Sequence, residues 1–155
     1  PLTVSSLFQD VRGTDAILPA ILWAWKNRVM AGIATGIFMP EKICTTEDVL
    51  TYLWRAAGCP GTGRDDASSP YEWAKATEII DETVYLNDSC SLETFLTYIW
   101  RFLGEPGKND AFGDYPDAWS WAEGTELLRL TPELQEPSAK CTRACVAVLL
   151  YHFFN

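Results

Sequence analysis

Three segments of the chain repeat one another without gaps, and this repetition constrains the fold more than any other feature. Each segment begins at a cysteine and continues with a hydroxyl residue, a polar turn and a run of apolar residues at helical spacing. The segments are residues 44–58, 90–104 and 141–155. A fixed internal period is typical of stacked repeats, and 155 residues suffice for one domain or a few small repeats.

Each repeated segment is predicted to form a helix. Thr45, Ser91 and Thr142 are N-cap residue types, whose side-chain oxygens accept hydrogen bonds from the first free backbone N–H groups. A glycine closes each of the first two segments, and a proline two residues later prevents the helix from continuing. Arg55 and Arg101 end matching helices, where a cation suits the helix dipole, so we expect a structural role for them.

A second helix is predicted before each of these segments. The predicted ranges are 19–29, 71–80 and 118–130, and a Trp-Ala pair occupies the matching place in each. The unit is therefore helix, loop, helix, three times. One such hairpin cannot bury its apolar face alone, so the three must pack together. We predict an all-α fold forming a single module over 1–155, with repeats at about 8–59, 65–105 and 111–155.

Composition bounds the partners of this module. Hydrophobic residues make up 48% of the chain, including seven Trp, which is enough material for a core. The net charge of -9 disfavours nucleic acid and anionic membrane surfaces as partners, because both require clustered Lys and Arg. No apolar run reaches the roughly 18 residues of a membrane span. The first residues also lack the basic start and apolar run of a signal peptide.

The chain has five cysteines, an odd number, so they cannot all pair with one another. One His and no Cys-x-x-Cys motif argue against a zinc site, and we expect neither a metal nor a cofactor. Cys44, Cys90 and Cys141 are expected to be small buried residues. Exported proteins usually avoid unpaired thiols. Five cysteines therefore favour burial, an anaerobic source or an intracellular role.

No catalytic constellation is visible, so we do not expect an enzyme. Acidic pairs such as Glu47-Asp48 are adjacent in sequence, and adjacent residues on a helix do not face each other. His152 lies in an apolar tail, where we expect it to be packed, and no Ser or Cys is spaced to form a triad with it. A carbohydrate hydrolase that takes two carboxylates from separate repeats stays open.

Several short motifs follow one another in a fixed order. The first repeat contains Phe8-Gln9-Asp10-Val11, Trp23-Ala24, Gly32-Ile33, Phe38-Met39-Pro40, Thr45-Thr46-Glu47-Asp48 and Leu53-Trp54-Arg55-Ala56-Ala57-Gly58. The third contains Phe112-Gly113-Asp114-Tyr115, Trp121-Ala122 and Thr142-Arg143-Ala144. Over nearly the whole chain, this combination resembles surface-layer homology (SLH) domains. The second repeat lacks the first motif and has a loop about four residues shorter.

The resemblance implies a pseudo-threefold helical bundle with one repeat per lobe and grooves between the lobes. It also implies noncovalent attachment of an exported protein to secondary cell-wall polymers, which are often acidic, pyruvylated glycans, and hence a location at the cell wall or cell surface. In this mode the Arg of a Thr-Arg-Ala-Glu motif lines the groove with nearby residues. The positions that match are Arg143, Thr142, Asp10, Asp114, Trp23, Trp121 and Gly32.

The chain departs from the family pattern at the groove. The motif arginine survives as Arg143 but is replaced by Thr46 and Leu92 in the other two repeats. An acidic glycan requires a cation, because charge-assisted pairing is the strong interaction available to it. We therefore expect at most one family-like groove, near Arg143. The alternative is a degenerate protein–protein interaction module without glycan binding, for which an intracellular location is not excluded.

Each site residue also has a structural interpretation. Arg143 could be a solvated residue of the first helical turn, and Asp10 and Asp114 could be turn or capping residues. The matched tryptophans could stack on sugar rings, but Trp recurring at helical spacing is more often part of a core. Trp25 and Trp119 lie off the matched position and are candidates for a partner surface.

Overall fold

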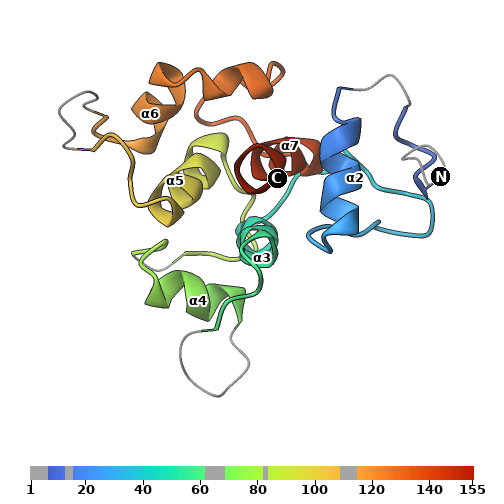
Figure 1. The fold of residues 1–155 in the computed structure, drawn as a ribbon, viewed down its shortest axis with the longest axis horizontal. Helices are drawn as coiled ribbons and strands as arrows, with labels where there is room; N and C mark the ends of the chain where they lie inside the picture. The colour runs from blue at the N-terminus through green and yellow to red at the C-terminus, as the bar shows by residue number, and fades with distance from the viewer. Residues whose placement is uncertain (1–6, 13–15, 62–68, 82–83, 109–114) are drawn as a thin grey trace.

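The computed structural model describes residues 7–12, 16–61, 69–81, 84–108 and 115–155. Within these residues the fold is helical, with isolated β-bridges and no strand, which confirms the all-α prediction (Figure 1). None of the described helices has the length and apolar character needed to cross a membrane. The elements are α2 (Leu18–Lys26), α3 (Thr46–Ala56), α4 (Pro70–Ala76), α5 (Leu92–Phe102), α6 (Ala118–Gly124), the 3-10 helix η1 (Leu127–Leu130) and α7 (Arg143–Phe154).

The three repeated segments form the long helices α3, α5 and α7, as predicted. Thr45, Ser91 and Thr142 are their N-caps, and each hydroxyl accepts from the backbone N–H three residues later, at 3.1, 3.2 and 3.2 Å. Asp48 returns a bond to the N–H of Thr45, which completes a capping box on α3. The first residues of α3, α5 and α7 could therefore be predicted from the sequence.

The first two N–H groups of each long helix are also occupied, by carbonyls from a distant part of the chain. In α3, Thr46 and Glu47 donate to the loop before α5. In α5, the first two residues donate to the loop before α7, and those of α7 donate to the loop before α3. The acceptors are the carbonyls of Asp88, Leu86, Ala139, Pro137, Lys42 and Pro40, at 2.7–3.0 Å.

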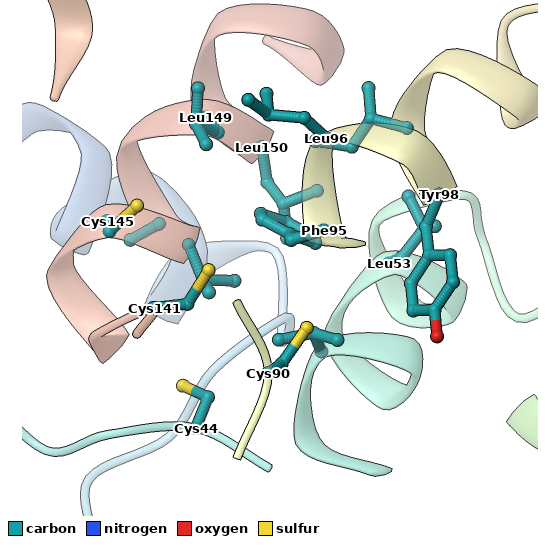
Figure 2. Close-up of a cluster of buried hydrophobic side chains, with 14 of the residues drawn as sticks. Cys44, Leu53, Cys90, Phe95, Leu96, Tyr98, Cys141, Cys145, Leu149 and Leu150 are labelled. Atoms are coloured by element: carbon teal, nitrogen blue, oxygen red, sulfur yellow. The ribbon is translucent and has the colours of Figure 1, made fainter. Parts of the chain in front are cut away.

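Three cysteines close a cycle of backbone hydrogen bonds at the same place. Cys44 N–H donates to the carbonyl of Cys141, Cys141 to that of Cys90, and Cys90 to that of Cys44, at 2.9, 2.9 and 3.0 Å. All three side chains are buried, as predicted, and lie near Cys145 among apolar neighbours (Figure 2). We call the three joined segments, residues 40–46, 86–92 and 137–143, the hub.

The short helices α2, α4 and α6 lie outside the long ones (Figure 1). α2 packs against α7, α4 against α3, and α6 against α5, while α3 also contacts α7. The helices α3 and α5 thus each contact the short helix that follows them in the chain, and α7 contacts α2. This pairing links the first part of the chain to the last and places a continuous apolar core around the hub.

The short helices end three to six residues earlier than predicted. Asn27, Thr77 and Thr125 cap them, each donating a side-chain hydrogen bond to the carbonyl four residues back, at 2.9, 2.7 and 2.6 Å. The next residue in each case has a left-handed backbone, with φ of 59–60°. These residues are Arg28, Glu78 and Glu126 rather than glycine, so the usual stop signal is missing from the sequence.

Candidate functional site

Arg143 lies in the interior of the molecule, with 3% of its surface exposed. Its Nε donates to the carbonyl of Phe38 at 2.9 Å, one Nη donates to the Tyr52 hydroxyl at 2.6 Å, and the other donates to the carbonyl of Ala31. The guanidinium also lies 4.4 Å from the centre of the Phe38 ring. The interpretation of Arg143 as a solvated first-turn residue is therefore wrong, because the side chain is buried and fastens α7 to the loop between α2 and α3.

The positions that match Arg143 in the other repeats are buried as well. Thr46 is 7% exposed and Leu92 is fully buried. A buried slot explains how Thr, Leu and Arg can share one position, since each fills space against the hub. Thr142 beside it is the N-cap of α7, and its hydroxyl is engaged with the N–H of Cys145.

Asp10 and Gly32 shape the loop that Arg143 contacts. The two carboxylate oxygens of Asp10 accept from the N–H groups of Phe38 and Met39, at 2.9 and 2.7 Å. These bonds hold Met39 in a left-handed conformation, with φ of 57°. A Cβ on Gly32 would meet two backbone carbonyl oxygens and the Phe8 ring at 2.9 Å, so only glycine fits there without movement. Both residues therefore have a structural function in this loop.

Two tryptophans of the Trp-Ala pairs, Trp23 and Trp121, contact aromatic residues of α7. Trp23 is half-buried and lies edge-on to Tyr151, with ring centres 5.9 Å apart. Trp121 is buried and stacks on Phe153 at 5.8 Å. These contacts favour a packing role over a sugar platform. His152, expected to be packed, is instead exposed, with its ring against that of Phe153.

One predicted site residue, Asp114, lies outside the described residues. The others have the internal partners given above. The structure joins Arg143, Asp10 and Gly32 through one loop, residues 31–40, whereas Thr142 caps α7. Trp23 and Trp121 belong to different helix contacts. Whether any of them binds a ligand stays a prediction.

A large half-open hollow lies elsewhere, beside α4 and the C-terminal end of α5. Its volume is about 820 Å³, and its lining is mainly polar. We call it the α4–α5 groove. Its charged lining residues are Lys75, Arg101, Lys108, Glu78, Asp81 and Glu105, and its other lining residues are Tyr71, Thr77, Ile80 and Gly104.

Local structure fixes the three cations of the α4–α5 groove. Lys75 follows Tyr71 by one helical turn, and its ammonium lies 5.3 Å from the centre of that ring. Arg101 donates to the carbonyl of Ile79 at 2.9 Å and to the Asp81 carboxylate at 3.2 Å. Lys108 pairs with the Glu105 carboxylate and lies over the Trp100 ring. Arg101 thus has the structural bond expected for it and also lines a hollow.

The segment after α5 is held in place by an indole. Trp100 Nε1 donates to the carbonyl of Pro106 at 3.0 Å, which folds the segment back across the end of the helix. Lys108 then lies 5.6 Å from the centre of the Trp100 ring, and its ammonium pairs with Glu105 at 2.9 Å. This arrangement gives Lys108 a defined position beside the groove.

The matched positions in the other repeats do not carry the same charges. Lys75 corresponds to Trp25 and Glu123, and Asp81 corresponds to Ala31 and Arg129. The set of charges is therefore specific to the second repeat, the one that matches the family motifs least. Sequence reasoning missed it because no motif contains these residues. The signal available was the Tyr71–Lys75 spacing on one helical face.

The thiols form no metal site within the described residues, where no group of three or more His, Cys, Asp or Glu side chains is arranged to hold an ion. Burial raises the pKa of the Cys44 thiol to about 12. Hydrogen bonding with the Cys145 and Cys90 thiols, together with burial, raises the pKa of Cys141. The thiolate is the reactive form of cysteine, so Cys44 and Cys141 are expected to be unreactive at neutral pH. Cys59 is exposed.

No protein-family model matches the sequence, and the search of curated proteins finds no match.

Proposed function

We propose that the chain attaches an exported protein noncovalently to an acidic cell-wall glycan, and that the α4–α5 groove is the binding site. The observation that carries this proposal is the meeting of Lys75, Arg101 and Lys108 in one groove, where they balance the carboxylates of Glu78, Asp81 and Glu105, in a chain whose net charge is -9. Charge-assisted hydrogen bonds to a carboxylate are the strongest polar contacts such a groove can offer.

The form of the groove supports a hydrated, polymeric ligand. Pockets for small drug-like molecules are mostly apolar and enclosed, whereas this one is polar and half open. The ring of Tyr71 lines the groove and lies next to the ammonium of Lys75. An aromatic ring and a cation side by side suit a sugar that carries an acidic group. Binding alone is proposed, without catalysis.

We also propose that the three helix-loop-helix repeats are arranged about a pseudo-threefold axis through the hub. The cyclic hydrogen bonds of Cys44, Cys90 and Cys141 support this arrangement, as does the recurring contact between a long helix and a short helix of another repeat. On this proposal the α4–α5 groove belongs to the second repeat and is distinct from the inter-repeat groove near Arg143 that the family resemblance implies.

A second candidate function, a protein–protein interaction module, is favoured by one other observation. Ile33, Met39 and Ile43 lie close together in the chain and are 46%, 41% and 50% exposed. Contiguous exposed aliphatic side chains mark interaction surfaces more often than isolated ones do. This surface lies beside the hub, away from the α4–α5 groove in sequence, so the two functions can be tested separately.

Sedimentation with isolated Gram-positive cell-wall sacculi tests the leading proposal. The purified chain is mixed with native sacculi and with sacculi stripped of secondary polymer. We expect polymer-dependent sedimentation, and a loss of affinity of about tenfold, or 1.4 kcal/mol, when Lys75→Ala and Lys108→Ala are combined. The matched control combines Lys26→Ala and Lys42→Ala, which remove the same charge from exposed positions outside the groove.

The two pairs of substitutions separate the possible outcomes. Loss of affinity in the groove variant alone supports the proposed site. An equal loss in both variants means that binding depends on overall charge and removes the α4–α5 groove as the site. Absence of sedimentation with every wall preparation contradicts glycan attachment and leaves the interaction module.

A further inference from the structure

A second hollow adjoins the α4–α5 groove. Its volume is about 220 Å³, and it shares three lining residues with the groove: Ile80, Asp81 and Arg101. Its remaining lining residues are Val84, Glu93, Thr94, Thr97 and Tyr98, from the loop before α5 and from α5 itself. The Arg101–Asp81 ion pair therefore borders both hollows, and we call the two hollows together the path.

The two hollows differ in their chemistry. The α4–α5 groove sets Lys75, Arg101 and Lys108 against three carboxylates, whereas the lining of the second hollow sets Arg101 against Asp81 and Glu93. A carboxylate accepts hydrogen bonds from sugar hydroxyls but repels an acidic substituent. The second hollow, where negative charge is in excess, is thus suited to a neutral sugar, and an acidic sugar is better accommodated beside Lys75 and Lys108 in the α4–α5 groove, where the charges balance.

Two threonines add further polar contacts in the second hollow. The Thr97 hydroxyl donates to the carbonyl of Glu93 at 2.8 Å, and the Thr94 hydroxyl accepts from Ser91 at 2.9 Å. A hydroxyl offers one donor and two acceptor lone pairs, so each retains capacity for a ligand. Both bonds also fix the rotamers, which presents a preorganised polar surface.

Arg101 is placed to divide the path. Its bond to the carbonyl of Ile79 anchors it, and its bond to Asp81 joins the two sides of the boundary. The Asp81 side chain is 62% exposed and that of Arg101 is 27% exposed, so both are accessible to a ligand that crosses between the hollows. A guanidinium has five N–H donors, more than these two bonds require.

We infer that the path takes an extended glycan in which acidic and neutral sugars alternate, with an acidic unit in the α4–α5 groove and a neutral unit in the second hollow. This inference rests on the proposed glycan-binding function and adds the length and charge pattern of the ligand. A single acidic sugar would fill the first hollow only. A chain with an acidic group on every unit would place one of them against Glu93 and Asp81.

Defined oligosaccharides test this inference by calorimetric titration. Hyaluronan oligosaccharides alternate a uronic acid with an N-acetylated amino sugar, oligogalacturonates carry an acid on every unit, and chitin oligosaccharides are neutral. We expect affinity in the hyaluronan series to rise about tenfold between the disaccharide and the hexasaccharide. At equal length we expect it to exceed that of both other series by about fivefold or more.

Reversal of one charge provides the sharper readout. Glu93→Lys replaces the carboxylate of the second hollow with a cation and should shift the preference toward oligogalacturonates by about fivefold or more. The matched control is Glu72→Lys, an exposed first-turn glutamate of α4 that lines neither hollow. A loss of fold would weaken all three series together, whereas the inference requires one series to gain.

The outcomes distinguish this inference from the function on which it rests. Affinity independent of length, or an unchanged preference in the Glu93→Lys variant, overturns it. So does the absence of binding to all three series. In each case polymer-dependent sedimentation with sacculi would still support wall attachment, whereas the loss of that sedimentation would remove the function itself.

Discussion

The hub and the α4–α5 groove lie at opposite ends of the long helices and use polar groups in opposite ways. At the hub, the first N–H groups of all three long helices and the guanidinium of Arg143 are engaged by carbonyls and hydroxyls of the same chain. In the groove, charged side chains line an open hollow. The comparison teaches that the motif residues hold this fold together, while the open polar surface comes mainly from residues outside the motifs, with Arg101 belonging to both.

The largest expected effect is at Arg143. Arg143→Ala should lower the free energy of unfolding by about 3–5 kcal/mol, because it leaves the acceptors on Phe38, Tyr52 and Ala31 without this donor and opens a cavity where the buried side chain was. Arg101→Ala, in the groove, should cost about 1 kcal/mol or less, since its ion pair is exposed to solvent. Urea unfolding of both variants measures the difference. A stable Arg143→Ala variant that fails to bind sacculi would contradict the α4–α5 groove as the binding site and would place the site at the hub.

The loop that receives Arg143 should tolerate little added volume. Gly32→Ala places a Cβ at 2.9 Å from the carbonyl oxygens of Ala34 and Ile37, and we expect a loss of about 1–3 kcal/mol. Gly32→Val should cost more if the cause is steric. A Gly32→Ala variant that is more stable than the wild type, through the lower entropy of its unfolded chain, would show that this loop is loosely packed.

Alkaline pH should weaken the hub. The pKa of Cys44 is raised from 9.0 to about 12 in the folded state, so the unfolded chain loses this proton first as the pH rises. The contribution of Cys44 to stability, which is full below pH 9, should then fall by about 1.4 kcal/mol per pH unit up to about pH 12. Urea unfolding between pH 8 and 11 measures the dependence of the unfolding free energy on pH. Cys44→Ala should reduce that slope by about 1.4 kcal/mol per pH unit, which corresponds to one proton.

Thiol labelling is the control for this interpretation. At neutral pH a water-soluble thiol reagent should modify Cys59 in the native protein, because this is the exposed cysteine. The other four should react after denaturation. Native labelling of Cys44 or Cys141 would mean that the hub opens readily, and its alkaline sensitivity would then need another source.

The smallest effect is expected at the periphery. Asp117 caps α6 by accepting from the N–H of Ser120 at 2.8 Å, and this bond lowers the pKa of its carboxyl group. Its contribution is present above the ordinary value of 3.8 and is lost as the pH falls through the lowered pKa. Asp117→Ala should cost about 1 kcal/mol near neutral pH. Asp117→Asn should retain most of the cap and lose its pH dependence, which thermal unfolding at pH 3 and pH 7 can compare.

The sequence predicts the framework of the fold well and its surface poorly. Capping by Thr45, Ser91 and Thr142 depends on local chemistry, and burial of Cys44, Cys90 and Cys141 follows from the usual behaviour of free cysteine as a small apolar residue, so both were predictable. The ends of the short helices were not, because Arg28, Glu78 and Glu126 adopt the left-handed conformation usually given to glycine. Tertiary context overrides the local preference at these three sites.

The candidate site was harder to predict, since it depends on which helices meet. Arg143 matches a motif position, but its burial arises from contact with a loop more than 100 residues away. Lys75 and Lys108 reach one groove because Trp100 folds the segment after α5 back over the helix end. Neither relationship is encoded by spacing along the chain.

The cyclic hydrogen bonds of Cys44, Cys90 and Cys141 have a consequence for biosynthesis. Each cysteine depends on both of the others, so the cycle cannot close before the last of them has left the ribosome. Until then the nascent chain carries two helix pairs whose apolar faces lack their final cover. Contacts between distant parts of a chain slow folding, and this chain joins its first third to its last. Its period of greatest exposure to chaperones and proteases is therefore expected to end only when α7 is complete.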